Sequence, residues 1–163
     1  MWKSLTKAYQ YLIFFGGFLK SPLLLLCRLY WGLGFLYAGW SKLEDIDKFT
    51  QYLEELNMFA PHFNAYIGAY VEFVGGLFLL IGFASRLTAI PLIIQMCFAY
   101  FLAHREALIE VSLFVGASPF NFLLASLIVL AFGPGRFSVD YLLEKWFFHR
   151  AQGVPTHQHL PHD

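Results

Sequence analysis

The sequence predicts an all-α protein that crosses a membrane as a four-helix transmembrane bundle. Of its 163 residues, 58% are hydrophobic and only 13% are charged, about half the charged fraction of a soluble domain. A chain of this length cannot bury so much apolar surface in one water-soluble core, so the bilayer is the expected solvent. The formal net charge is zero, which argues against nucleic acid as a partner because such proteins carry a basic surface.

Four apolar runs supply the expected membrane helices, at residues 23–41, 64–83, 87–103 and 119–133. A spanning helix needs about 20 residues. The fourth run is the shortest and must therefore begin earlier, with turns from 107–118, or tilt, or cross a thin part of the bilayer. The link at 84–86 is so short that the second and third helices must form an antiparallel hairpin.

Three further segments are expected to lie at the membrane surface as amphipathic helices. Residues 1–22 form the first, because their apolar run is too short to span and ends in no small-residue cleavage site; a fifth spanning helix there stays open. The outer loop 42–62 has helical spacing of apolar residues, and so does the stretch that begins at Val139. We therefore expect three parts of the chain: an N-terminal interfacial segment (1–22), a four-helix membrane domain (23–143), and a C-terminal part (144–163) that contains the end of the last interfacial helix and a His-rich cytoplasmic tail.

The orientation follows from the Lys and Arg residues near the helix ends, which concentrate on the cytoplasmic side. One side carries only Lys42, Lys48 and Arg105. The other carries Lys3, Lys7, Lys20, Arg86, Arg136, Lys145 and Arg150. We therefore expect a multi-pass protein of the bacterial inner membrane with both termini in the cytoplasm.

Two ionisable residues lie inside the apolar runs, Arg28 in the first and Glu72 in the second. Each shares a helix face with glycines, and small residues at this spacing let helices approach closely in lipid. The packing residues expected from this pattern are Gly32, Gly39, Gly68, Gly75 and Gly76. Counted from the cytoplasmic ends of the runs, Arg28 lies roughly 7–8 Å deep and Glu72 roughly 16 Å deep.

This difference in depth predicts that Arg28 reaches Glu72 directly or through one water, with Lys42 as the weaker candidate partner. Two interpretations stay open: the charges only hold the bundle together, or they line a polar pocket for a head group, a quinone carbonyl or a proton path. Gln95 and Asn121 are candidates for the wall of this pocket. Its expected cytoplasmic rim is formed by Arg86, Arg136 and Asp140.

No metal or haem site is expected from the sequence. No apolar run holds a pair of histidines at depth, as a bis-histidine haem would need. Cys27 and Cys97 lie in separate runs and form neither a Cys-x-x-Cys pair nor a zinc spacing. Any cofactor is therefore left unknown, with a quinone as the candidate.

Three sequence blocks resemble the DoxX family of small bacterial and archaeal membrane proteins. They are residues 27–43, residues 71–76 continuing to Gly82 and Arg86, and residues 133–140. The resemblance covers about 23–143 and implies a four-helix membrane bundle. Some relatives are described as subunits of quinone-linked oxidoreductases, notably thiosulfate:quinone oxidoreductase, and others as members of membrane complexes for redox stress.

The resulting hypothesis is an accessory subunit of a quinone-linked membrane oxidoreductase, more a non-catalytic subunit than an enzyme by itself. Its partners would be membrane lipids and another protein of the complex. One alternative is a non-catalytic scaffold or assembly protein. A second alternative, a carrier of small molecules or lipids, is weaker because the chain shows no inverted repeat with broken helices.

Overall fold

The computed structural model describes residues 2–152, and all regular structure in that range is helical. In chain order the elements are α1 (Trp2–Glu44), α2 (Ile46–Glu55), α3 (Pro61–Ile81), α4 (Ser85–Ala103), the 3-10 turn η1 (Arg105–Leu108), α5 (Val111–Gly116), α6 (Ser118–Phe132) and α7 (Val139–Gln152). The all-α prediction is confirmed for this part of the chain, and the four apolar runs fall on α1, α3, α4 and α6.

In the part of the chain that the structure describes, three helices are long and apolar enough to cross a membrane: Gly16–Glu44 within α1, Pro61–Ile81 and Ser85–Ala103. The 15 residues of α6 give only about 22 Å of rise, against a hydrocarbon core of about 30 Å. The segment before α6 adds no turns to it, because Ala117 is extended (ψ 143°) and separates α5 from α6. A fourth complete span therefore stays a prediction.

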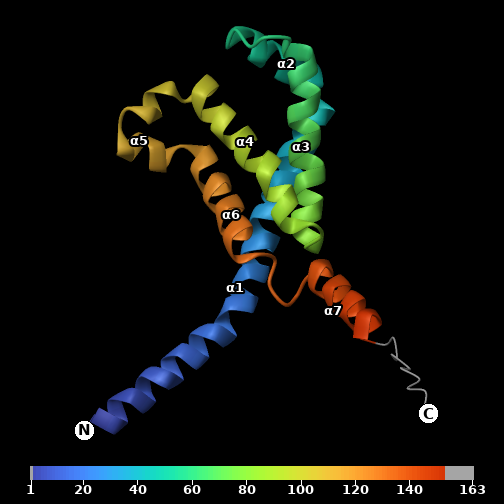
Figure 1. Ribbon diagram of the computed structural model, residues 1–163. Helices are drawn as coiled ribbons and strands as arrows, with labels where there is room; N and C mark the ends of the chain where they lie inside the picture. Colours follow the sequence, from blue (N-terminus) through green and yellow to red (C-terminus); the bar gives the residue numbers. More distant parts are fainter. Residues whose placement is uncertain (1, 153–163) are drawn as a thin grey trace, which may run out of the picture.

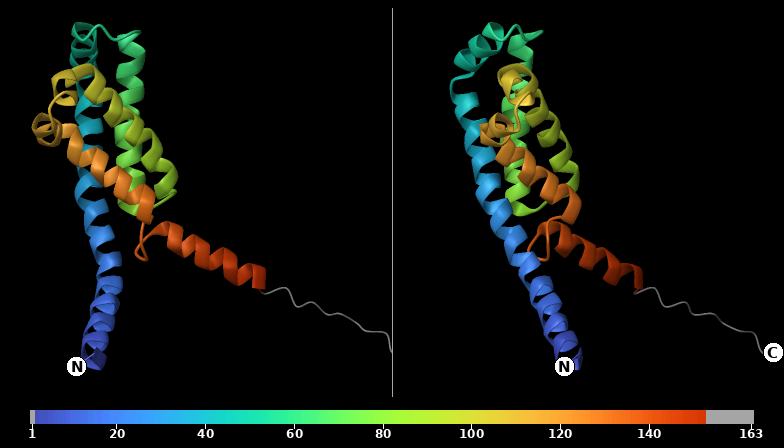
Figure 2. Two further views of the ribbon diagram at one scale, coloured as in Figure 1. Left: turned by 60° about the vertical axis from the view of Figure 1, so that its left-hand side comes forward. Right: turned by 90° about the vertical axis from the view of Figure 1, so that its left-hand side faces the viewer.

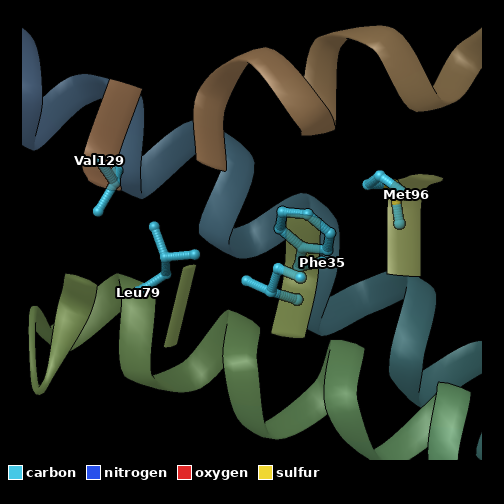
Figure 3. Packing of buried hydrophobic residues seen from close by; sticks show 5 residues of the cluster. Phe35, Leu79, Met96 and Val129 are labelled. Atoms are coloured by element: carbon cyan, nitrogen blue, oxygen red, sulfur yellow. The ribbon is translucent and has the colours of Figure 1, made fainter. Parts of the chain in front are cut away.

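The helices pack in pairs. α1 runs along α3, α4 runs along α6, and α3 also packs against α4 and against the short helix α2; the pairs cross at the centre of the bundle (Figure 1). The buried core lies where they meet and contains Phe35 of α1, Leu79 of α3, Leu92 and Met96 of α4, and Val129 of α6. Figure 3 shows four of these side chains directed into the same space.

α1 and α3 are held in one register by glycines on their facing surfaces. A Cβ atom built on Gly39 would collide with the backbone nitrogen of Phe73, and one built on Gly76 would collide with that of Leu36. At Gly32 the nearest atom to such a Cβ is Leu80 Cγ, at 3.0 Å. The two backbones are therefore nearly in contact over several turns, and the helices cannot slide without a clash.

Residues 1–22 do not form a helix of their own, because α1 continues from Trp2 through Pro22 to Glu44 without a break; the position of this segment at the membrane surface stays a prediction. Proline removes one helical hydrogen bond, but the residues on both sides of Pro22 remain helical. Figure 2 shows the first half of α1 extending beyond the rest of the bundle.

The other two flanking helices form where the sequence places them. α2 begins after Asp45, whose side chain accepts from the Lys48 amide at 3.3 Å. α7 begins after Ser138, whose Oγ accepts from the Tyr141 amide at 3.1 Å. Their positions at a membrane surface stay predictions, and the His-rich tail lies outside the described residues.

We predict that Gly39→Ala and Gly76→Ala each lower the free energy of unfolding by about 1–3 kcal/mol, the usual cost of overpacking. Each new methyl group would push α1 and α3 apart at their closest approach. The measurement is equilibrium unfolding of the purified protein in detergent micelles.

The matched control is Gly16→Ala, also in α1, where a Cβ meets nothing within 4 Å. This control should be neutral or stabilise by up to about 1 kcal/mol, since alanine is the better helix former. Equal stability of all three variants would show that the glycines do not set the packing of α1 against α3.

Candidate functional site

Glu72 of α3 is the most buried carboxylate among the described residues, with 3% of its surface exposed. Its partner is Lys42, near the end of α1, whose Nζ donates to both carboxylate oxygens at 2.5 Å. The Lys42 side chain is 28% exposed. The pair therefore joins a buried carboxylate to an ammonium group that lies at the edge of the bundle.

Two more elements complete the surroundings of this carboxylate. From α4, the Gln95 amide nitrogen donates to Glu72 Oε1 at 2.9 Å and to the Gly68 carbonyl at 3.0 Å. From α2, the Phe49 ring lies under the ammonium group, with Lys42 Nζ 4.9 Å from the ring centroid. Side chains from four helices thus meet at one buried ion pair, in which the charges compensate each other.

A cavity of about 540 Å³ adjoins the pair, and Lys42, Glu72 and Gln95 form part of its wall. Most of the remaining lining is apolar. It comes from α2 (Phe49, Tyr52, Leu53, Leu56), α3 (Ile67, Val71), α4 (Pro91, Ile94, Met96, Phe98, Ala99, Leu102) and α6 (Pro119, Phe122). A space of this size with few convergent polar groups is typical of a small-molecule site.

The prediction that Arg28 reaches Glu72 is wrong. With Gly39 beside Phe73 and Gly32 beside Leu80, Lys42 is the α1 residue that lies level with Glu72. Arg28 is fourteen residues earlier, or about 21 Å along the helix. The sequence estimate placed the start of the first apolar run and the end of the second at the same depth, whereas α1 continues past the start of its run.

Arg28 instead holds the turn between α6 and α7. Only 1% of its surface is exposed, and its guanidinium group donates to the Pro134 carbonyl at 2.8 Å and the Phe137 carbonyl at 2.6 Å. A Cβ on Gly82 would collide with Arg28 Nη1, so the end of α3 must carry a glycine where the guanidinium group passes. Within the described residues, Arg28 Nε is buried without a hydrogen-bond partner.

Asp140 fixes the same turn to the α3–α4 link. Its carboxylate accepts from the amides of Ala84 at 2.6 Å and Ser85 at 2.9 Å, where it caps the positive end of α4. Its own amide donates to the Gly82 carbonyl at 3.0 Å. Arg28 and Asp140 therefore tie α1, the α3–α4 link and the start of α7 together.

The remaining predicted site residues lie apart from the cavity. Arg86 is exposed at the start of α4, near Gly133, and Arg136 is exposed in the turn itself. Asn121 is exposed on α6 and is not among the residues that line the cavity. The predicted polar site thus divides into Lys42, Glu72 and Gln95 at one end of the bundle and the Arg28 cluster at the other.

Sequence reasoning missed two features of these clusters. It gave no role to the carbonyls of Pro134 and Phe137, since a backbone acceptor leaves no mark in the sequence. It also missed the contribution of α2 to the cavity, although the apolar spacing of Phe49, Tyr52, Leu53 and Leu56 was the available signal that this helix covers something.

We predict that Arg28→Lys leaves the helices intact but releases the 133–140 turn. A single ammonium group cannot reach both carbonyls, and hydrogen bonds to a charged group contribute about 1.5–3 kcal/mol each. Amide hydrogen exchange of Asp140 and Tyr141, whose N–H groups donate to the Gly82 carbonyl and to Ser138 Oγ, should therefore become at least about tenfold faster, measured by mass spectrometry in detergent micelles.

The matched control is Arg105→Lys, since Arg105 is exposed and its Nε donates only to the nearby Phe101 carbonyl. It should leave exchange in the turn unchanged. Unaltered exchange in a folded Arg28→Lys variant would contradict the anchoring role of Arg28.

Comparison with known proteins gives a family match over residues 23–105. The matching family is DoxX, and the matched residues include Arg28, Lys42, Glu72 and Gln95. The 133–140 turn lies beyond the matched residues. No solved structure matches the chain.

Two relatives cover most of the chain. One is the inner membrane protein YqjF of Escherichia coli, 30% identical over 121 residues, which are 74% of this chain and 92% of the relative. The other is the uncharacterized membrane protein Rv3486 of Mycobacterium tuberculosis, 32% identical over 136 residues, which cover 76% of this chain and 83% of the relative. The chain is therefore a membrane protein and belongs to the DoxX family.

Proposed function

We propose that this chain is a non-catalytic subunit of a quinone-linked membrane oxidoreductase and binds an uncharged quinone or quinol beside the Lys42–Glu72 pair. The observation that carries the proposal is the cavity itself: about 540 Å³, mostly apolar, with Lys42, Glu72 and Gln95 in its wall. Volumes of this order accommodate a ligand of drug size.

The lining supports a ligand that arrives from the bilayer. Three of the lining side chains, Ile67, Ile94 and Phe98, are also 45–55% exposed. They lie on α3 and α4, two of the helices that can span the membrane. The cavity therefore reaches the surface of the bundle that faces lipid, which suits a ligand dissolved in the membrane.

The polar groups support a neutral head group. Lys42 and Glu72 compensate each other, so an anion or a cation would face no net opposite charge. Lys42 donates to both Glu72 oxygens and keeps one of its three ammonium hydrogens available to a carbonyl oxygen of a quinone. The Gln95 amide nitrogen is engaged with Glu72 and Gly68, which leaves its amide oxygen as an acceptor for a quinol hydroxyl.

In this proposal the chain binds the quinone, and a protein partner in the complex carries out electron transfer. Among the described residues no group of three His, Cys, Asp or Glu side chains is placed to hold a metal ion. Cys27 and Cys97 are both free and lie on different helices. A redox partner would therefore supply the electrons, while this chain orients the quinone head group.

The proposal also includes location in the inner membrane with both termini in the cytoplasm. Lys20, Arg86 and Arg136 lie at the end of the bundle from which α7 leaves, which agrees with the excess of positive charge on cytoplasmic loops. The name of the relative from Escherichia coli, an inner membrane protein, supports the same location.

We predict that the purified chain binds the short-chain quinone ubiquinone-1 and that Lys42→Met weakens this binding about tenfold or more. The variant loses a charge-assisted hydrogen bond, which contributes about 1.5–3 kcal/mol. A second variant, Ala99→Trp, fills the cavity without touching the ion pair and should abolish binding. Both affinities can be measured by isothermal titration calorimetry in detergent micelles.

The matched control is Lys48→Met, because Lys48 is exposed on α2 and does not line the cavity. It should bind ubiquinone-1 as the parent chain does. The proposal fails if the parent chain binds no ubiquinone-1, or if a folded Ala99→Trp variant binds it unchanged.

A further inference from the structure

A second polar surface, independent of the cavity, lies at the opposite end of the bundle. Its cations are Lys20 of α1, Arg86 of α4 and Arg136 of the turn after α6, and all three are exposed. Lys20 Nζ lies 5.3 Å from the centroid of the Phe132 ring. A Cβ at the next residue, Gly133, would be 3.3 Å from Arg86 Nε. Lys20 and Arg86 therefore lie beside Phe132 and Gly133, and Arg136 follows in the same turn.

Among the residues whose side chains the structure describes (10–11 and 16–146), no carboxylate pairs with these cations, and the one ion pair is Lys42–Glu72. Asp140 is the nearest acid in the sequence after the turn, and its two oxygens are occupied by the amides of Ala84 and Ser85. Glu144 follows on α7 beside Lys145, which offsets its charge. The surface is left with a local excess of positive charge.

The turn also offers backbone donors. In the described part of the chain, no protein group accepts a hydrogen bond from the amides of Gly135, Arg136 or Phe137. Three consecutive N–H groups without a protein acceptor, beside three cations, are donors that an oxyanion can use.

Apolar side chains adjoin this surface. Leu23, Phe132 and Phe137 are each 57–58% exposed. Leu23 follows Lys20 on α1, and Phe132 and Phe137 flank the turn that carries Arg136. This arrangement places charged groups next to apolar surface beside the middle of α1, the end of α6 and the start of α4. It matches a molecule that carries a phosphate and hydrocarbon chains together.

The other end of the bundle has the reverse charge. It carries Glu44, Asp45, Asp47, Glu54, Glu55, Glu106 and Glu110, against the unpaired cations Lys48 and Arg105. An anion would therefore be attracted to one end of the bundle only.

From these observations we propose that Lys20, Arg86 and Arg136, together with the amides of Gly135, Arg136 and Phe137, form a binding site for the phosphate head group of an anionic phospholipid. The cations attract the head group, the turn amides orient its oxygens, and the exposed Leu23, Phe132 and Phe137 contact the acyl chains. This site shares no residue with the cavity, so the failure of the quinone proposal would not affect the lipid proposal.

The test is lipid binding to the purified full-length chain in detergent micelles, followed by native mass spectrometry. The probes are dioleoylphosphatidylglycerol, which is anionic, and dioleoylphosphatidylcholine, which has the same chains and no net charge. We expect preferential retention of the anionic lipid. Each cation contributes about a fivefold factor in affinity, so Lys20→Gln/Arg86→Gln/Arg136→Gln should weaken binding about a hundredfold.

The control is Lys48→Gln/Arg105→Gln, which removes two exposed cations from the opposite end and should leave binding unchanged. If the triple variant does not fold, as judged by circular dichroism, the three single variants replace it, each with an expected fivefold loss. Equal retention of the two lipids, unchanged binding by the variants, or an equal loss in the control overturns the proposal. Full displacement of the lipid by inorganic phosphate also overturns it, since the ligand would then be a free anion.

Discussion

The close approach of α1 to α3 is the constraint on which the rest of the structure depends. Gly39 and Gly76 leave no room for a side chain between the two backbones. Only one register of these two helices therefore avoids a clash. That register brings Lys42 level with Glu72 and Arg28 level with Gly82. Both polar clusters of the molecule are therefore consequences of where small residues allow two helices to touch.

The two clusters have different physical roles. At one end an ion pair compensates a buried carboxylate, whose charge would otherwise cost several kcal/mol in a low-dielectric surrounding, and it does so beside a cavity. At the other end Arg28 and Asp140 bind mainly backbone groups and fix a turn. Lys42 and Glu72 face a cavity, so either can bind a ligand there. Arg28 binds two backbone carbonyls, so its guanidinium group is not available to a ligand.

Much of this fold could be predicted from the sequence, because apolar runs at spanning length and short links decide helix positions in a membrane protein. Glu72, Lys42 and Gln95 were all recognised as candidates. What failed was the pairing of Arg28 with Glu72. Helix register depends on backbone contacts such as that of Gly39 with Phe73, and a count of residues from the end of an apolar run does not report it. The continuation of α1 through Pro22 was missed because the length of an apolar run does not report how far the helix extends beyond it.

A double-mutant cycle tests most directly whether Lys42 and Glu72 form one neutral pair at the wall of the cavity. The free energy of unfolding is measured in detergent micelles for Lys42→Met, Glu72→Gln and the double variant. Lys42→Met leaves the buried carboxylate unpaired and should lower the free energy of unfolding by about 2 kcal/mol. This loss is smaller than that from breaking a fully buried ion pair, because Lys42 is 28% exposed. The double variant should recover at least half of that loss. Additive losses from the two substitutions would show that the two residues do not interact and would contradict the account.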